Sequence, residues 1–186
     1  MPLQNRVTPT GEIIAHAARG TLMGNRGILH DETRRLGAAR WRHRAWICCR
    51  LSFKDRRREV MAPGRYTELF FLDEATALAA GHRPCYECRR DDFRAFRAAW
   101  RRALGSPDAS AAGIDRALHE ARVDPRTRRQ IRFEAALDDL PDGTFVLLPD
   151  DTSALLLIAG DRLLPWHPGG YGPPQPRPTD ARCLVL

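Results

Sequence analysis

The chain has 186 residues, enough for one ordinary domain or two small ones with a hydrophobic core, so metal is not required for folding. Its formal charge is +7, and Lys54 is the only lysine among its 30 basic residues. The first residues lack the basic start and apolar run of an export signal, and no segment approaches the roughly 20 apolar residues of a membrane span. We therefore expect a cytoplasmic protein with no membrane partner.

The excess of arginine has two interpretations. A GC-rich genome replaces lysine by arginine in all its proteins, and the charge then says nothing about function. Alternatively, guanidinium groups pair bidentately with phosphate, and a net positive field attracts nucleic acid without sequence preference. The sequence shows no signature of a small-molecule cofactor.

In the N-terminal half, residues 6–30 show neither a helical nor a strand period, and we expect mostly loop with short strands or turns. Residues 45–53 alternate as a strand does, with Cys49 on the apolar face and Cys48 on the other. A turn over residues 54–58 then predicts a hairpin. The strands expected in this half are residues 45–53, 58–62 and 66–71.

In the remainder, Asp73 is the expected N-cap of a helix over residues 74–80, which Gly81 ends. Towards the C-terminus, short apolar runs are separated by Pro-Asp, Asp-Gly and Gly-Asp turns, which favours a small β meander. A Gly/Pro-rich tail with a last short strand follows. The other expected elements are helices over residues 91–104, 114–123 and 125–140, a linker over 105–113 and the meander over 141–166.

Two of the five cysteines, Cys85 and Cys88, have the spacing C-x-x-C. Covalent haem attachment needs histidine after the second cysteine, but Arg89 stands there. A thioredoxin-like dithiol lies between a strand and a helix, whereas this pair follows a helix and a turn, which weakens the redox interpretation. Zinc needs about four nitrogen or sulfur ligands, and this spacing lets two thiolates reach one ion. We therefore predict a zinc site.

The remaining zinc ligands must come from elsewhere in the chain. Adjacent residues of a strand point to opposite faces, so one of Cys48 and Cys49 is a ligand and the other is a packed or reactive thiol. The apolar neighbours of Cys49 also favour a place in the core. The fourth ligand is open among the second of these two cysteines, His82, His43 and Cys183.

The run LFFLDEATALAAGHRPCYECRRDD resembles the metal-binding module of the Ada DNA alkylation-repair protein and the related zinc modules appended to some nucleases. The resemblance is confined to residues 68–92. It implies zinc binding with more specificity than it implies a function. The matching residues are Phe70, Phe71, Glu74, Ala75, Ala79, Ala80, Gly81, Arg83, Pro84, Cys85 and Cys88.

In Ada-like modules a zinc-bound cysteine accepts a methyl group from a DNA phosphotriester. Those modules have two upstream cysteines separated by three residues, whereas Cys48 and Cys49 are adjacent. Zinc lowers the pKa of a bound thiol, so methyl transfer to either cysteine is chemically reasonable. The different spacing makes methyl acceptance the weaker of the two enzymatic hypotheses.

A second candidate site is the segment GNRGILHD, residues 24–31. Histidine to activate water, aspartate to hold Mg²⁺ or Mn²⁺, and arginine to meet developing charge are the parts of a phosphodiester hydrolase. The alternative is a pair of glycine turns whose polar side chains cap backbone groups. The candidate catalytic residues are His16, Asn25, Arg26, His30 and Asp31.

Arginine gathers in three segments, residues 34–44, 54–58 and 89–102, the first of which includes Trp41 as a stacking surface. An amphipathic helix with solvated arginines explains most of the third segment. The candidate nucleic-acid-binding residues are Arg40, Trp41, Arg42, Arg44, Arg56, Arg57, Arg58, Arg83, Arg89 and Arg90.

We therefore expect an α+β fold in which a zinc-stabilised, Ada-like hairpin and helix core precedes helices and a small β module. We expect a zinc protein whose function is to bind nucleic acid, DNA in particular, and in which zinc has a structural role. The alternatives are a metal-dependent DNA endonuclease or repair enzyme and a zinc-stabilised protein-interaction module. The expected parts are residues 1–104 (zinc domain with a loop-rich N-terminal extension), 105–140 (helical linker) and 141–186 (β module with its tail).

Overall fold

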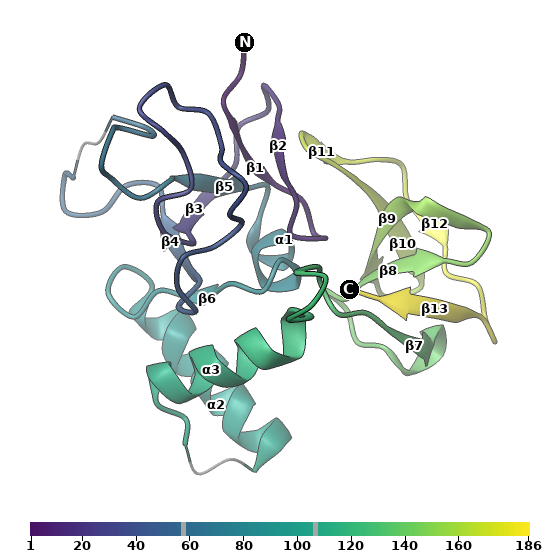
Figure 1. Cartoon of the computed structure of the whole chain (residues 1–186). Helices are drawn as coiled ribbons and strands as arrows, with labels where there is room; N and C mark the ends of the chain where they lie inside the picture. The colour runs from purple at the N-terminus through teal and green to yellow at the C-terminus, as the bar shows by residue number, and fades with distance from the viewer. Residues whose placement is uncertain (57–58, 106–107) are drawn as a thin grey trace.

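The computed structural model describes residues 1–56, 59–105 and 108–186 and has the predicted α+β fold. Two sheets lie side by side, and helices α2 and α3 lie beneath the first of them (Figure 1). The elements are β1 (Gln4–Val7), β2 (Ile13–Ala15), β3 (Leu22–Asn25), β4 (Ile47–Arg50), β5 (Leu69–Phe71), α1 (Glu74–Ala79), β6 (Arg83–Pro84), α2 (Arg90–Leu104), α3 (Ala111–Arg122), β7 (Phe133–Ala136), a 3-10 turn (Leu137–Asp139), β8 (Phe145–Leu148), β9 (Asp151–Ala159), β10 (Arg162–His167), β11 (Gly170–Tyr171), β12 (Gln175–Pro176) and β13 (Arg182–Val185).

The first sheet has the strand order β2-β1-β5-β3-β4-β6 and mixes parallel with antiparallel pairs. Strand β4 pairs antiparallel with β3 and parallel with β6. One face packs on α1, and Leu69, Phe71 and Ala77 in this core are fully buried. This burial of apolar area is the main stabilising contribution of the N-terminal half.

The predicted cap of α1 is confirmed. The Asp73 carboxylate accepts a hydrogen bond from the Thr76 backbone N–H at 2.8 Å, which satisfies one of the unpaired donors of the first turn. The helix ends before Gly81, whose φ of +83° is the left-handed conformation that glycine adopts without strain.

A buried ion pair joins α3 to the first sheet. Arg83 of β6 donates from Nε and Nη2 to the two carboxylate oxygens of Asp115 at 2.7 and 2.8 Å. Both residues are buried, and Phe93 of α2 lies beneath the guanidinium group. Among the described residues, no helix is both long and apolar enough to cross a membrane.

The second sheet confirms the predicted C-terminal β meander. Strands β8, β9 and β10 are consecutive antiparallel neighbours, and β13 inserts between β8 and β7. Its core includes Val146, Ile158, Leu163 and Cys183. Two hydrogen bonds attach this sheet to the region around α1. Trp166 donates to Thr76 at 3.1 Å, and Tyr171 donates to Asp73 at 2.6 Å.

Three local expectations were wrong. Strand β4 is shorter than predicted and its faces are reversed, because Cys48 points into the core and Leu51 is 51% exposed. No strand includes residues 59–62 of the predicted 58–62 strand, where Glu68 accepts the Met61 backbone N–H instead. The helix predicted over residues 125–140 is a turn region followed by β7 and the 3-10 turn, since β7 can pair with β13.

The Arg83–Asp115 pair gives a direct stability test. Asp115→Ala leaves a buried guanidinium without its counter-ion, and we expect the free energy of unfolding to fall by about 3–5 kcal/mol. Asp91→Ala, which removes a carboxylate from an exposed pair with Arg94, is the matched control and should cost at most about 1 kcal/mol. Urea denaturation measures both. Equal effects of the two substitutions would contradict a structural role for the buried pair.

Candidate metal centre and arginine-lined cavity

Three thiols from two segments converge at the end of the first sheet. Cys49 lies on β4, and Cys85 and Cys88 lie in the turn between β6 and α2. Their sulfur atoms all lie within 4.8 Å of one another. Within the described residues, this is the one group of three or more histidine, cysteine or acidic side chains with metal-binding geometry.

The backbone explains why these thiols meet. The parallel pairing of β4 with β6 is closed by two hydrogen bonds, from the Arg83 N–H to the Trp46 carbonyl and from the Cys85 N–H to the Cys48 carbonyl. The chain therefore enters the C-x-x-C turn beside Cys49. Because adjacent strand residues alternate, Cys48 faces the core and is 1% exposed.

Hydrogen bonds and burial shift the pKa values of the clustered thiols and of Cys48 beside them. The hydrogen bond that Cys49 donates to Cys85, together with burial, raises the pKa of Cys49 well above its ordinary value. A hydrogen bond from the Cys49 thiol, aided by backbone N–H groups of Cys88 and Glu87, lowers the pKa of Cys85 to about 5. The Arg50 N–H donates to the Cys88 sulfur at 3.4 Å. Burial raises the pKa of Cys48 to about 12, which keeps this cysteine a neutral thiol against the Arg89 guanidinium.

The donor set fits a zinc ion. Zinc binds thiolate sulfur at about 2.3 Å, so two sulfurs on a tetrahedral ion are separated by roughly 3.8 Å, which is within the 4.8 Å that encloses the three sulfur atoms. Soft thiolates select zinc over magnesium or calcium, which prefer oxygen. Three thiolates leave one tetrahedral position for a further ligand such as water. Cys49, Cys85 and Cys88 are therefore placed to bind a metal.

The other candidate ligands lie outside this group. His82 is 1% exposed between the rings of Trp46 and Phe71, and its Nε2 accepts a hydrogen bond from Arg26 at 3.3 Å. Burial, with Arg26 and Arg122 close by, holds the pKa of His82 well below its usual value, so the ring is neutral.

The two remaining candidates for the fourth ligand are also engaged elsewhere. His43 contacts the Asn25 side chain at 3.0 Å, and Cys183 lies in the core of the second sheet.

The candidate hydrolytic residues of the segment 24–31 have separate local partners. The two ring nitrogens of His30 contact the Thr67 hydroxyl at 2.6 Å and the Ala62 carbonyl at 3.3 Å. Asp31 accepts hydrogen bonds within a turn from Thr33 and Arg35.

The other three members of that set are held by different elements. Asn25 contacts His43, Arg26 lies against His82, and the exposed His16 accepts the Ala18 N–H. Most of these contacts match the turn and capping interpretation, and catalysis at this segment stays a prediction.

The candidate nucleic-acid-binding residues divide by their contacts. Arg83 and Arg89 are buried in ion pairs, Arg56 pairs with Glu87, and Arg90 lies over the Tyr86 ring. The residues exposed or partly exposed around one loop are Arg40, Trp41, Arg42 and Arg44. The candidates that fall outside the described residues are Arg57 and Arg58.

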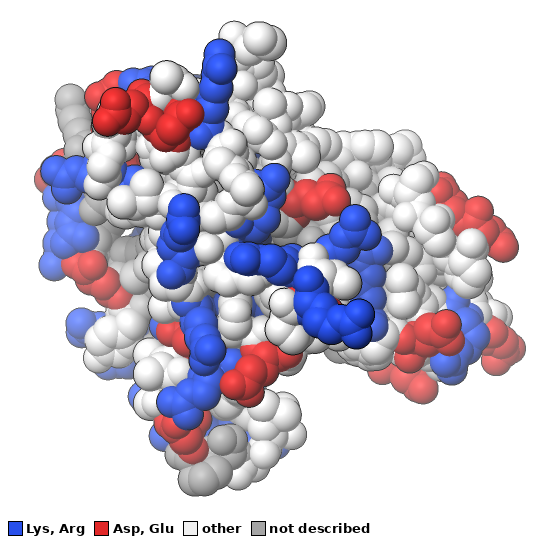
Figure 2. Space-filling model, in the orientation of Figure 1, with Lys and Arg blue, Asp and Glu red and all other residues white. Residues whose placement is uncertain are grey.

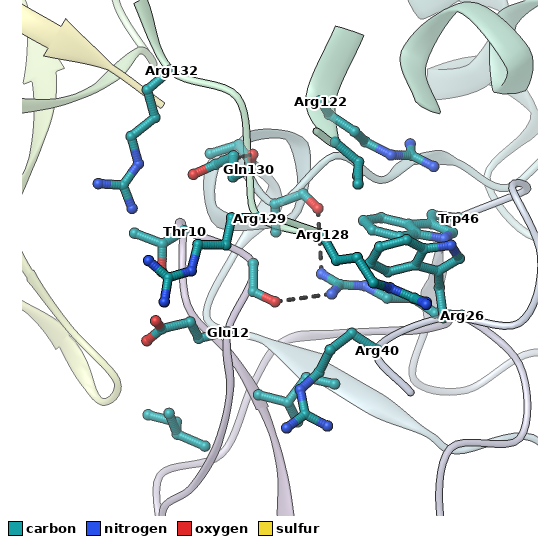
Figure 3. A pocket seen from close by; sticks show the side chains of 17 residues that line it. Thr10, Glu12, Arg26, Arg40, Trp46, Arg122, Arg128, Arg129, Gln130 and Arg132 are labelled. Carbon is teal, nitrogen blue, oxygen red and sulfur yellow. Dashed lines mark hydrogen bonds between the residues drawn. The ribbon is translucent and has the colours of Figure 1, made fainter. Parts of the chain in front are cut away.

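A cavity of about 710 Å³ lies where the β1–β2 turn, the loop before β4, the end of α1 and the segment after α3 meet. Basic side chains gather at the centre of this face, between the two sheets (Figure 2). Among the described residues that line the cavity, Glu12 is the one acidic residue. The basic lining residues are Arg26, Arg40, Arg122, Arg128, Arg129 and Arg132, and Figure 3 shows them around the hollow.

The inner wall of the cavity is a cluster of arginine and tryptophan. The guanidinium groups of Arg26 and Arg122 lie 4.0 and 3.8 Å from the Trp46 ring centre. Arg26 donates to the carbonyls of Gly11 and Ala80 (Figure 3). Its Nε–H donates to His82. Neither arginine has a carboxylate partner among the described residues.

Burial weakens the charged form of both groups, although the nearby Asp115 carboxylate partly offsets this effect for Arg122. Burial, with a smaller contribution from the neighbouring Arg122, lowers the pKa of Arg26 to about 9, and burial lowers that of Arg122 to a similar value. Both groups still carry their charge at neutral pH. The structure therefore concentrates positive charge on the inner wall of the cavity.

Sequence reasoning missed most of this cavity. Residues 125–140 were expected to form a helix, and nothing in the sequence indicated that the arginines of this segment lie near Arg40 and Trp41. The signal in the sequence was the run RTRRQIR, which begins shortly after the end of α3. The folded structure places this run beside the first sheet, because the chain turns back after α3. There Gln130 donates to the Pro9 and Ala79 carbonyls.

Comparison with protein-family models, with curated proteins and with solved structures found no match. The resemblance of residues 68–92 to the Ada metal-binding module stays a prediction.

Cysteine substitutions test the metal centre. We expect Cys49→Ser, Cys85→Ser and Cys88→Ser each to lose bound metal, because two thiolates with a neutral hydroxyl bind zinc much more weakly. Cys48→Ala and Cys183→Ala are the matched controls and should keep it. Metal analysis of purified protein measures the stoichiometry. Loss of metal from Cys48→Ala, or its retention in Cys85→Ser, would contradict this ligand set.

Proposed function

We propose that the protein binds one structural zinc ion through Cys49, Cys85 and Cys88, and that its arginine-rich face binds nucleic acid, DNA in particular. The observation that carries the nucleic-acid proposal is the set of arginines around Trp41 and Trp46 without carboxylate partners among the described residues. Elsewhere, the buried Arg83 and Arg89 are paired with acids.

A structural role suits the position of the metal centre. The three thiols connect β4 to the turn that starts α2, and an ion there would cross-link segments that lie far apart in the sequence. The two sulfur atoms of the turn also receive backbone N–H groups, which favour thiolates. When bound, the zinc ion would supply charge neutralisation and a cross-link.

Phosphate recognition suits the chemistry of the exposed arginines. The exposed Arg40, Arg42 and Arg44 flank Trp41 in the sequence, Arg40 lines the same cavity as Trp41, and Arg128 lies 4.3 Å from the Trp41 ring centre. Arginine forks pair with phosphate oxygens, and an aromatic ring between them offers a stacking surface for a base. The resemblance of residues 68–92 to a DNA-repair module favours DNA over RNA.

Salt dependence tests nucleic-acid binding. We expect the wild-type protein to shift a single-stranded or duplex DNA probe, with affinity falling linearly on a log–log plot against salt. Arg42→Gln/Arg44→Gln should reduce the steepness of this plot by about 0.7–0.9 for each phosphate that the variant no longer neutralises. Arg101→Gln/Arg102→Gln, in the exposed last turn of α2, removes the same charge and should change the slope little.

Absence of any shift at low salt would overturn the nucleic-acid proposal and favour a zinc-stabilised protein-interaction module. Equal loss of slope in the two double variants would show a response to net charge alone and would contradict a defined binding face.

A further inference from the structure

The arginine-lined cavity has more positive charge than the protein itself neutralises. Six arginines and one acidic residue, Glu12, are among its described lining residues. They come from four separate parts of the chain, so the grouping is produced by the fold and is not a run of local composition. A GC-rich codon bias supplies arginines but does not bring them to one cavity.

The buried pair at the inner wall donates to backbone carbonyls and, from Arg26, to His82, but contacts no carboxylate among the described residues. Arg26 and Arg122 are 2% and 9% exposed. Buried charges are costly unless they are paired, and the other buried arginines of the described residues, Arg83 and Arg89, are paired with carboxylates. The Nε–H of Arg122 is buried without a hydrogen-bond acceptor among the described residues.

The shape of the cavity limits what can neutralise this charge. Its inner wall is buried, whereas its rim has the exposed Arg40, Arg128, Arg129 and Arg132. The inner wall therefore suits a compact anion such as a single phosphate group. Guanidinium forks bind phosphate oxygens bidentately, so several can share one dianion.

The aromatic residues favour a nucleotide over inorganic phosphate. Trp41 lines the same cavity, and its ring lies under the guanidinium of the exposed Arg128. A nucleobase can take the position of this arginine, since bases stack on tryptophan with useful affinity. The volume of about 710 Å³ lies within the range of small-molecule sites.

We propose that this cavity binds the phosphomonoester group of a nucleotide, with Arg26 and Arg122 at its inner wall and Arg129 and Arg132 at its rim. The phosphomonoester comes either from a free nucleotide or from the phosphorylated end of a strand, and only the second source rests on the proposed nucleic-acid binding.

Two matched ligand pairs test the proposal by calorimetric titration at constant ionic strength. The first pair is adenosine 5′-monophosphate and adenosine. The second is a short single-stranded DNA with and without a 5′-phosphate. In at least one pair, the phosphorylated ligand should bind at least about tenfold more tightly, because charge-assisted hydrogen bonds to the terminal phosphate exist only there.

Variants at the rim separate the cavity from general charge. Arg129 and Arg132 are exposed and lie outside the hydrophobic core. The double variant Arg129→Gln/Arg132→Gln should therefore stay folded and should reduce the preference for the phosphorylated ligand by at least about tenfold. Arg101→Gln/Arg102→Gln removes the same charge from α2 and should preserve the preference. Circular dichroism checks that both variants are folded.

The outcomes distinguish this inference from the proposed function. A preference in the nucleotide pair alone assigns a free nucleotide, and a preference in the strand pair alone assigns a strand end. DNA binding without any phosphate preference would overturn the cavity proposal and leave the proposed function intact. No preference in either pair, or equal effects of the two double variants, would likewise overturn the proposal.

Discussion

The short parallel pairing of β4 with β6 is the constraint on which both candidate sites depend. Two backbone hydrogen bonds, to the carbonyls of Trp46 and Cys48, hold these strands together. Alternation along β4 then gives neighbouring residues different environments. Trp46 meets the buried arginines, Cys48 faces the core, and Cys49 meets the thiols of the C-x-x-C turn. A shift of one residue in this register would move the wrong cysteine to the metal centre and would also displace the tryptophan.

The buried arginines fall into two groups, those paired with carboxylates and those without such a partner among the described residues. Arg83 of β6 is paired with Asp115 of α3, and Arg89, at the start of α2, is paired with Glu74 of α1 and Asp92 of α2, so we expect substitution of these carboxylates to lower stability. Arg26 and Arg122 instead donate to carbonyl groups and lie against Trp46. His82 stays neutral between them and accepts one of these hydrogen bonds, so a residue that the sequence suggested as a zinc ligand supports the cavity.

Local signals in the sequence predicted the α+β class, the capped helix α1, the amphipathic helix α2 and the C-terminal meander. These features depend on nearby residues: a cap at Asp73, a glycine after the helix, and turns between apolar runs. The candidate zinc pair in the C-x-x-C turn was predictable for the same reason. Long-range pairing was not predictable from the sequence. The face of Cys49 was misjudged because Leu51 lies beyond the end of β4 and is exposed. Residues 133–136 of the predicted helix form strand β7 because β13, far along the chain, offers a strand partner.

The central claim is that three thiolates, and not four, hold one metal ion. X-ray absorption at the zinc edge measures the ligands around the metal most directly. The proposed zinc centre predicts three sulfur ligands at about 2.3 Å together with one lighter oxygen or nitrogen ligand at about 2.0–2.2 Å. A spectrum with four sulfur ligands would show that Cys48 or Cys183 joins the centre, and a first shell of nitrogen and oxygen alone would show that the cysteine group does not bind the metal. Either result would contradict a metal centre of three thiolates.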